Sequence, residues 1–266
     1  MTDHVTVAVR LRPWISSDTG TRRQTVHVQD GTTAELLDPA TGHQRALFSF
    51  DCCFDSATAT DAQADQAAIF DRLAPPLLSS CVEGYNITMF AYGQTGSGKS
   101  HTMVGSREAP GFTPRFISAL FSECDMVRRA DPGVEIAVEA SYLEIYMETV
   151  RDLLNPTVRP ATRRKSNDAS SSTLAAASGG LRVREHPRTG PYVEDLSKVA
   201  CGTAVQVATL LEHGNSVRAV RATNMNAASS RSHAIFTLKV TQRCALEDST
   251  RTSAVEIGRA SCRERV

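Results

Sequence analysis

Hydrophobic and polar residues alternate along this chain in blocks that predict short strands separated by helices. Apolar residues at every second position are typical of strands, and apolar residues three or four positions apart are typical of helices. The expected strands are residues 5–10, 87–92, 134–145, 181–184, 192–200 and 235–240, and the expected helices are residues 61–82, 113–130, 147–154 and 203–213. Strands that alternate with helices predict an α/β fold with a mixed sheet.

Prolines and glycines mark the expected ends of these elements. Pro13 ends the first strand, because a central strand needs the backbone N–H that proline lacks. Pro75 and Pro76 are expected to kink or restart the first helix, and Gly214 is expected to end the last helix. Residues 155–180 are rich in serine and alanine and predict a flexible surface insertion.

Composition places the chain among ordinary globular proteins. Of its 266 residues, 41% are hydrophobic and 22% are charged. The 29 basic and 29 acidic residues cancel, so we expect no overall basic surface and no binding to nucleic acid. Apolar runs such as residues 87–92 are too short to insert into a membrane. The seven cysteines show no C-x-x-C spacing and are interpreted as reduced thiols of a cytosolic protein, with Cys52 and Cys53 packing on two faces of an edge strand.

Residues 93–100 carry the strongest chemical signal in the sequence. They match G-x-x-x-x-G-K-[ST] directly after an expected buried strand, which is the context that a phosphate-binding loop requires. Glycines let backbone amides surround a phosphate, while Lys99 would neutralise the β- and γ-phosphates and Ser100 would offer a hydroxyl to Mg²⁺. The alternative is a glycine-rich turn beside an exposed lysine. The predicted phosphate-binding residues are Gly93, Gln94, Thr95, Gly96, Ser97, Gly98, Lys99 and Ser100.

A second polar segment, residues 226–233, lies between an expected helix and an expected strand. It reads Asn-Ala-Ala-Ser-Ser-Arg-Ser-His. The adjacent hydroxyls of Ser229 and Ser230 can meet an anion or a metal-bound water. By itself the segment reads more simply as an ordinary serine-rich loop, so its interpretation depends on the phosphate loop.

Together these two segments resemble the kinesin motor domain. The family's phosphate loop and first switch are similar to residues 90–103 and 226–233, in the same order and spacing. The resemblance extends over residues 4–243, and residues 184–197 look like the subfamily that carries organelles and vesicles. Further family strings are matched by R-L-R-P at 10–13, F-D-C-C-F at 50–54, S-Y-L-E-I-Y at 141–146 and V-R-D-L-L at 150–154.

The resemblance implies a P-loop NTPase fold, with a mixed central sheet and helices on both faces, and it implies ATP and Mg²⁺ as ligands. In the family, the positions of Arg10, Pro13 and His101 border the adenine. That chemistry is reasonable, because a guanidinium and an imidazole stack on a purine face.

The resemblance also implies roles for the first switch. Ser229 and Ser230 would stand around the γ-phosphate and the Mg²⁺-bound water, with Ser229 joining Ser100 at the metal. Asn226 would order the loop, and Arg231 would pair with an acidic residue of the second switch. The expected catalytic residues are therefore Lys99, Asn226, Ser229, Ser230 and Arg231.

The family's second switch, D-L-A-G-S-E, does not occur in the sequence, so the expected fold is incomplete at its C-terminal end. Residues 256–266 resemble an in-frame translation of a sequencing-library adapter, and we expect them not to be biological; the alternative is a divergent tail from alternative splicing. They offer no apolar face to pack and are excluded from the expected fold. Residues 1–255 would form a partial motor domain whose central strands lack neighbours, which predicts instability or aggregation.

These observations leave three functions to weigh. The first is an ATP-dependent microtubule motor, and the second is a truncated module that binds nucleotide or tubulin without moving. The third, another kind of P-loop NTPase, is disfavoured by residues 226–233. For this chain we expect poor microtubule-stimulated hydrolysis, because Arg231 lacks its partner.

Expected partners and location follow from the motor interpretation. The partner would be tubulin in microtubules, and cargo would bind through regions beyond the motor domain. The protein would act in the cytoplasm on the cytoskeleton, without membrane insertion. The basic residues 163–165 are expected to be a solvated loop, and their alternative role is a weak contact with the acidic tails of tubulin.

Overall fold

A computed structural model describes residues 5–15, 24–58, 61–155, 180–187, 190–224, 232–244 and 249–261. The predicted insertion, apart from its end residues, and residues 226–231 of the second polar segment lie outside the described residues. The chain divides into two compact units. The first contains Met1–Arg72 and Arg107–Ala109, and the second contains Leu73–Ser106 and Pro110–Val266.

The first unit is built from two small sheets. Its strands are β1 (Ala8–Leu11), β2 (Val26–Val28), β3 (Thr33–Leu37), β4 (Gln44–Ser49) and β5 (Cys52–Asp55). β1 pairs in parallel with β5, whereas β2, β3 and β4 form an antiparallel sheet in that order. Cys52 and Cys53 are each only 6% exposed. Because neighbouring residues of a strand face opposite sides, this agrees with the expected packing of both thiols.

Helix α1 (Ala62–Glu83) begins in the first unit and ends in the second. The prediction that Pro75 and Pro76 restart the helix is wrong, because the helix continues through both. Both prolines lie on its exposed side, and the carbonyls of Asp71 and Arg72, which lose their partners, belong to exposed residues. Ala74, Leu78 and Cys81 are buried on the other side and hold the helix in place: their exposed fractions are 0%, 8% and 0%.

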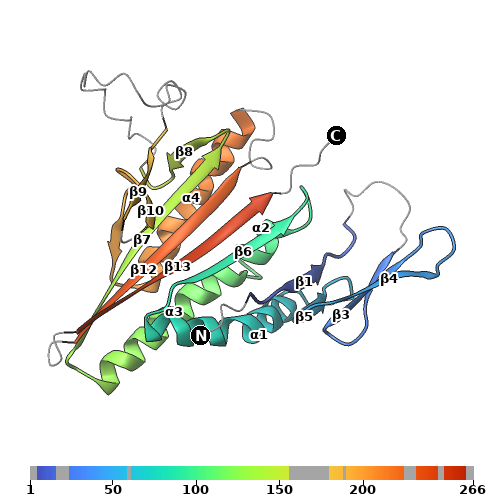
Figure 1. Ribbon diagram of the computed structural model, residues 1–266, viewed down its shortest axis with the longest axis horizontal. Helices are drawn as coiled ribbons and strands as arrows, with labels where there is room; N and C mark the ends of the chain where they lie inside the picture. The colour runs from blue at the N-terminus through green and yellow to red at the C-terminus, as the bar shows by residue number, and fades with distance from the viewer. Residues whose placement is uncertain are drawn as a thin grey trace. The chain divides into compact units, whose positions relative to one another are not determined.

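The second unit contains a larger mixed sheet. Its strand order is β11–β7–β12–β13–β6, and β8 also pairs with β7 (Figure 1). Only β13 and β6 run parallel, so the predicted mixed sheet is confirmed. These strands are β6 (Ile87–Gly93), β7 (Val134–Tyr146), β8 (Thr149–Asp152), β11 (Val199–Cys201), β12 (His233–Cys244) and β13 (Ser249–Ser261); β9 (Val183–His186) and β10 (Gly190–Val193) form a separate hairpin.

The core of the second unit lies between this sheet and its helices. Three helices contact the sheet: α2 (Lys99–Met103), α3 (Phe112–Ala130) and α4 (Ala204–Asn224). Phe236 of β12 meets the ring of Tyr142 edge to face, with 5.3 Å between centroids. Phe116 and Leu120 of α3 are fully buried, as the helical spacing predicts. Among the described residues, no helix is long and apolar enough to cross a membrane.

The helix expected at residues 147–154 is wrong. Met147 and Glu148 have φ values of 47° and 60°, and β8 follows them and pairs back onto β7. A two-residue hairpin turn of this kind requires positive φ at both central residues and is normally made by asparagine and glycine. The sequence carries neither residue at this turn, so the usual signal for a hairpin is missing.

The predicted end of the last helix at Gly214 is also wrong, because α4 continues to Asn224. A Cβ atom at Gly214 would lie 2.3 Å from Cδ1 of Tyr142. The glycine therefore allows the helix to approach the ring of a sheet residue, which is a packing role and not a capping role.

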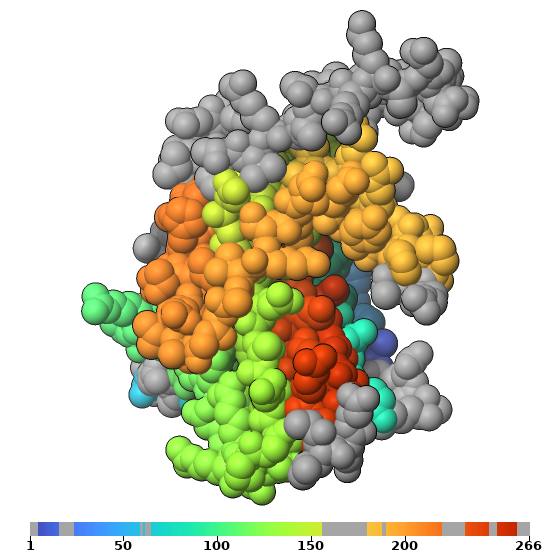
Figure 2. Space-filling view, turned by 90° about the vertical axis from the view of Figure 1, so that its left-hand side faces the viewer, coloured from blue at the N-terminus to red at the C-terminus, as the bar shows by residue number. Residues whose placement is uncertain are grey.

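The expectation that residues 235–240 form the last strand fails in the same way. β12 extends to Cys244, and β13 then inserts between β12 and β6. β13 includes part of the segment 256–266, so the claim that this segment has no apolar face to pack is wrong: Ile257 is only 5% exposed. Other residues of β13 reach the surface, in red in Figure 2. The non-biological origin of the segment stays a prediction.

Among the described strands, β6 pairs only with β13, and the residues of β6 are exposed or half-buried. Phe90 is 60% exposed and Tyr92 is 67% exposed. The strand itself was predicted correctly, but its predicted burial was wrong. β6 thus forms one margin of the described sheet, with exposed aromatic residues, and the expectation that central strands lack neighbours stays a prediction.

Candidate functional site

The predicted phosphate loop joins the end of β6 to the start of α2. Gly96 and Gly98 have φ values of 80° and 95°, which only glycine adopts at little cost. Ser97 N–H donates to the carbonyl of Gln94 at 3.2 Å, so the loop turns back tightly on itself. The strand, the glycine-rich turn and the following helix are arranged as a phosphate-binding loop requires.

Lys99 lies inside this loop and is only 6% exposed. Its Nζ donates hydrogen bonds to the carbonyl oxygens of Gly93 and Gln94, at 2.7 and 2.6 Å. The loop therefore holds a buried positive charge by its own backbone. An anion that enters the loop would meet that charge within a short side-chain movement. This contradicts the alternative of a turn beside an exposed lysine.

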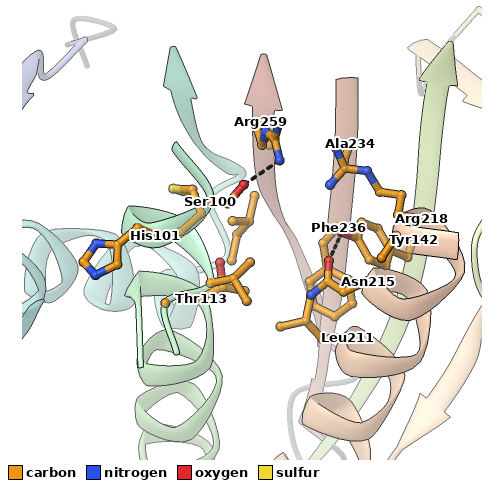
Figure 3. Close-up of a pocket in the computed structure, with 16 residues that line it drawn as sticks. Ser100, His101, Thr113, Tyr142, Leu211, Asn215, Arg218, Ala234, Phe236 and Arg259 are labelled. Atoms are coloured by element: carbon orange, nitrogen blue, oxygen red, sulfur yellow. Dashed lines mark hydrogen bonds between the residues drawn. The ribbon is translucent and has the colours of Figure 1, made fainter. Parts of the chain in front are cut away.

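Ser100 borders a cavity of about 570 Å³ in the second unit (Figure 3). Its hydroxyl accepts a hydrogen bond from Nη1 of Arg259 at 2.5 Å. Burial lowers the pKa of Arg259, and the positive charge of Arg218 lowers it further. Mg²⁺ at Ser100 would require Arg259 to move, because two cations would otherwise compete for one hydroxyl oxygen. Sequence reasoning missed Arg259 because residues 256–266 were excluded from the fold.

The far wall of the cavity is formed by the sheet and α4. In Figure 3, Tyr142 and Asn215 are joined by a hydrogen bond, in which the Tyr142 hydroxyl donates at 2.8 Å. Burial raises the pKa of Tyr142, although the nearby Arg218 partly opposes this rise. Tyr142 therefore stays a neutral hydrogen-bond donor at physiological pH. The His101 ring points away from this wall.

Arg218 of α4 links the sheet to Ser232, the first residue of the second polar segment that the structure describes. Its Nε donates to Oε1 of Glu144 at 3.1 Å, and its Nη2 donates to Oγ of Ser232 at 3.3 Å. The sequence did not predict this ion pair, because no spacing signal connects residues that are 74 positions apart.

Arg10 belongs to the first unit, where it makes an ion pair with Asp65. Its Nε also donates to Oγ of Ser56 at 2.7 Å, and its Nη1 donates to Oε1 of Gln66 at 3.0 Å. Contacts with three residues in the plane of the guanidinium fix its orientation. Sequence reasoning missed all three partners.

The predicted site residues are thus only partly assembled by the described structure. The loop residues 93–100 lie together, whereas Arg10 and Pro13 belong to a different unit from His101. The adenine contact that would join them stays a prediction. Asn226, Ser229, Ser230 and Arg231 lie outside the described residues. Within the described ranges, no group of three or more His, Cys, Asp or Glu side chains could hold a metal ion, and the predicted Mg²⁺ ligands are hydroxyls.

Comparison with known proteins gives consistent results. The family model "Kinesin motor domain" matches residues 10–260. The chain is 42% identical over 245 residues to the kinesin-like protein KIF1C of Homo sapiens, covering 90% of this chain and 20% of that protein. It is 39% identical over 249 residues to the kinesin-like protein unc-104 of Caenorhabditis elegans, covering 92% of this chain and 14% of that protein. The chain thus spans a fifth or less of the length of these curated relatives.

Solved structures show the same likeness. A structure described as a fast kinesin superposes with a TM-score of 0.78 at 30% sequence identity, covering 98% of this chain and 66% of that chain. A KIF14 dimer with AMP-PNP in complex with a microtubule superposes with a TM-score of 0.77 at 35% identity, covering 98% of this chain and 69% of that chain. These similarities confirm the resemblance and the fold class expected from the sequence.

Proposed function

Because the chain belongs to the kinesin motor domain family, we propose that it binds Mg-ATP at residues 93–100 and that the complete protein couples ATP hydrolysis to movement along microtubules. The observation that carries this proposal is the buried Lys99 beneath a glycine-rich turn at the end of β6. A preformed cationic loop with left-handed glycines suits a polyphosphate and few other ligands.

Within this proposal, each predicted residue keeps a defined task. Lys99 exchanges its two carbonyl partners for phosphate oxygens, and the loop's amides hold the remaining oxygens. Ser100 and Ser229 would hold Mg²⁺, which when bound neutralises charge on the phosphates. The adenine would lie against Arg10, Pro13 and His101.

The first switch completes the proposed site. Ser229 and Ser230 would orient the water and the γ-phosphate, and Asn226 and Arg231 would order the loop around them. Hydrolysis at such sites depends mainly on positioning and on charge stabilisation, so small displacements of these hydroxyls would cost rate.

The proposed partner is the microtubule, and the proposed location is the cytoplasmic cytoskeleton. The KIF14 structure that resembles this chain is a complex with a microtubule, which supports the proposal. Cargo would bind outside the motor domain, in parts of the longer protein.

The direct test is calorimetric titration of the chain with Mg-ATP, before and after Lys99→Ala. Loss of the charged hydrogen bonds between the Lys99 ammonium group and the phosphates should weaken binding by about tenfold or more. Lys239→Ala is a matched control, because Lys239 is half exposed and stands 3.9 Å from Glu139 on the sheet. Binding that is equally tight in wild type and Lys99→Ala would contradict the proposed site.

A second candidate function is a module that binds nucleotide without producing movement. The hydrogen bond between Arg259 and Ser100 favours it, because it occupies the hydroxyl that Mg²⁺ would need. Microtubule-stimulated ATP turnover separates the two candidates: a motor accelerates on microtubules, whereas a binding module does not.

A further inference from the structure

Arg10 of β1 is held by three side chains of the first unit. Its Nε donates to Oγ of Ser56 at 2.7 Å, its Nη1 donates to Oε1 of Gln66 at 3.0 Å, and its Nη2 forms the ion pair with Oδ2 of Asp65. The Arg10 and Asp65 side chains are only 14% and 12% exposed, so salt and water screen the pair weakly. Each of the three guanidinium nitrogens therefore has a fixed partner.

Ser56 joins these contacts into a closed ring. Because its Oγ accepts a hydrogen bond from Arg10, its own proton is directed to the Asp65 carboxylate, whose two oxygens both lie 2.9 Å away. The backbone N–H of Ser56 donates to the carbonyl of Leu11 at 3.1 Å, which holds the serine against the end of β1. Ser56 and Gln66 are only 3% and 2% exposed. Reorienting the guanidinium would leave buried polar groups without partners, which is costly.

These contacts use the edge of the guanidinium and are compatible with a ligand on its face. The N–H bonds of arginine lie in the plane of the group, whereas an aromatic ring stacks on the flat face. A side chain that is already held loses little conformational entropy when it binds a ligand, and this pre-organisation strengthens binding. The ring of contacts therefore suits Arg10 to hold a planar base.

We propose that Asp65 is a positioning residue, which acts through Arg10 and sets how tightly the purine base of a bound nucleotide is held. The proposal rests on the proposed function for the nucleotide itself. The Asp65 carboxylate is engaged by Arg10 and Ser56, so its effect on the base is carried by the arginine. The network thus contributes to the affinity for a nucleotide and contributes nothing to the affinity for a bare polyphosphate.

The test compares the calorimetric affinity of the whole chain for Mg-ADP with that for Mg-pyrophosphate, which carries no base. The ratio of the two affinities isolates the contribution of the nucleoside. We expect Asp65→Asn to lower this ratio by about fivefold, because a neutral amide holds the guanidinium less firmly. The affinity for pyrophosphate should not fall, since removal of a negative charge does not weaken the binding of an anion.

The matched control is Asp51→Asn, which removes the same charge from the same unit. Oδ2 of Asp51 accepts a hydrogen bond from the backbone N–H of Val7 at 2.7 Å, so this carboxylate holds the chain just before β1. The ratio should stay at its wild-type value in this variant. An equal fall in Asp51→Asn and Asp65→Asn would mean that any loosening around β1 weakens nucleotide binding, and it would overturn the proposal.

A double variant shows whether Asp65 acts through the arginine. Arg10→Lys keeps the positive charge but removes the flat face, and it should lower the ratio by about tenfold. Adding Asp65→Asn to Arg10→Lys should then lower the ratio no further, because the two residues act as one unit. A second fall of about fivefold in the double variant would overturn the proposal.

Ser56→Ala guards against an Asp65→Asn variant that fails to fold. It keeps the ion pair and removes only the hydroxyl that accepts from Nε of Arg10. We expect the ratio to fall by about threefold, because one of the three contacts is lost. An unchanged ratio in this variant would contradict the role of the network.

The wild-type measurement separates this proposal from the proposed function. If the wild-type chain binds neither Mg-ADP nor Mg-pyrophosphate, the proposed function fails and the positioning role fails with it. If it binds both equally, or if the ratio is unchanged in Asp65→Asn and Ser56→Ala, the phosphate site stands and the positioning role alone is overturned.

Discussion

The strands β12 and β6 both carry large apolar side chains, but those of β12 are buried and those of β6 are exposed to solvent. β12 lies between two antiparallel neighbours, and Phe236 and Leu238 are buried at 2% and 0% exposure. Among described strands β6 has one neighbour, and Phe90 is 60% exposed. The burial of a strand's side chains thus depends on what packs around the strand, and the apolar content of the strand itself does not reveal it.

The largest test of this contrast replaces one phenylalanine on each strand with alanine. Phe236→Ala should lower the free energy of unfolding by about 3–5 kcal/mol, because it leaves a cavity against Tyr142. Phe90→Ala should change it by less than about 0.5 kcal/mol. Urea denaturation measures both. Similar losses would show that β6 is covered in solution and would break the contrast.

The next test compares two glycines. Gly214→Ala should cost about 1–3 kcal/mol, because the added Cβ would overlap the ring of Tyr142. At Gly258, beside β6, the nearest atom to an added Cβ is Cβ of Phe90 at an ordinary 3.5 Å, so Gly258→Ala should cost nothing. Thermal unfolding of the two variants side by side gives the answer, and a loss at Gly258 would count against the loose packing of this margin.

A smaller, stabilising effect is expected at the turn between β7 and β8. Glu148→Gly should raise the free energy of unfolding by about 1 kcal/mol, because glycine tolerates the left-handed conformation that Glu148 adopts. Glu135→Gly on β7 is the control and should lower stability by about 0.5–1 kcal/mol. If both variants lose stability, the positive φ at Glu148 does not describe the turn in solution.

The smallest expected effect concerns β13, which separates the two compared strands. Arg259→Met should tighten Mg-ATP binding by about threefold, because it removes a positive charge that competes for the Ser100 hydroxyl. Arg251→Met, an exposed change on the same strand, should leave affinity unchanged. Titration calorimetry at fixed Mg²⁺ measures both, and weaker binding in Arg259→Met would mean that the arginine assists the ligand.

Sequence patterns predicted the elements whose signals are local. α3 follows its apolar periodicity within one residue, and α1 does so despite its prolines. The phosphate loop was found for the same reason, since its glycines and Lys99 occur within eight consecutive residues.

The misses share a different cause, which is contact between distant residues. Gly214 reads as a helix end unless Tyr142 is known to lie against it. Glu144 and Arg218 become a pair only when β7 and α4 meet, and Arg259 reaches Ser100 only through the pairing of β13 with β6. No periodicity or motif in the sequence indicates these long-range contacts. Sequence reasoning therefore identified the phosphate loop but not the residues that surround it.

The pairing of β7 has a consequence for how this protein tolerates insertions and deletions. Tyr142 and Glu144 are two residues apart on one strand, so both face α4. There Tyr142 bonds to Asn215, and Glu144 bonds to Arg218 about one helical turn further along. A deletion of one residue before them would carry both side chains to the opposite face of the sheet. Conservative substitutions along β7 therefore keep each side chain on its face of the sheet. A change in the number of residues would instead shift the register and disrupt every contact that follows.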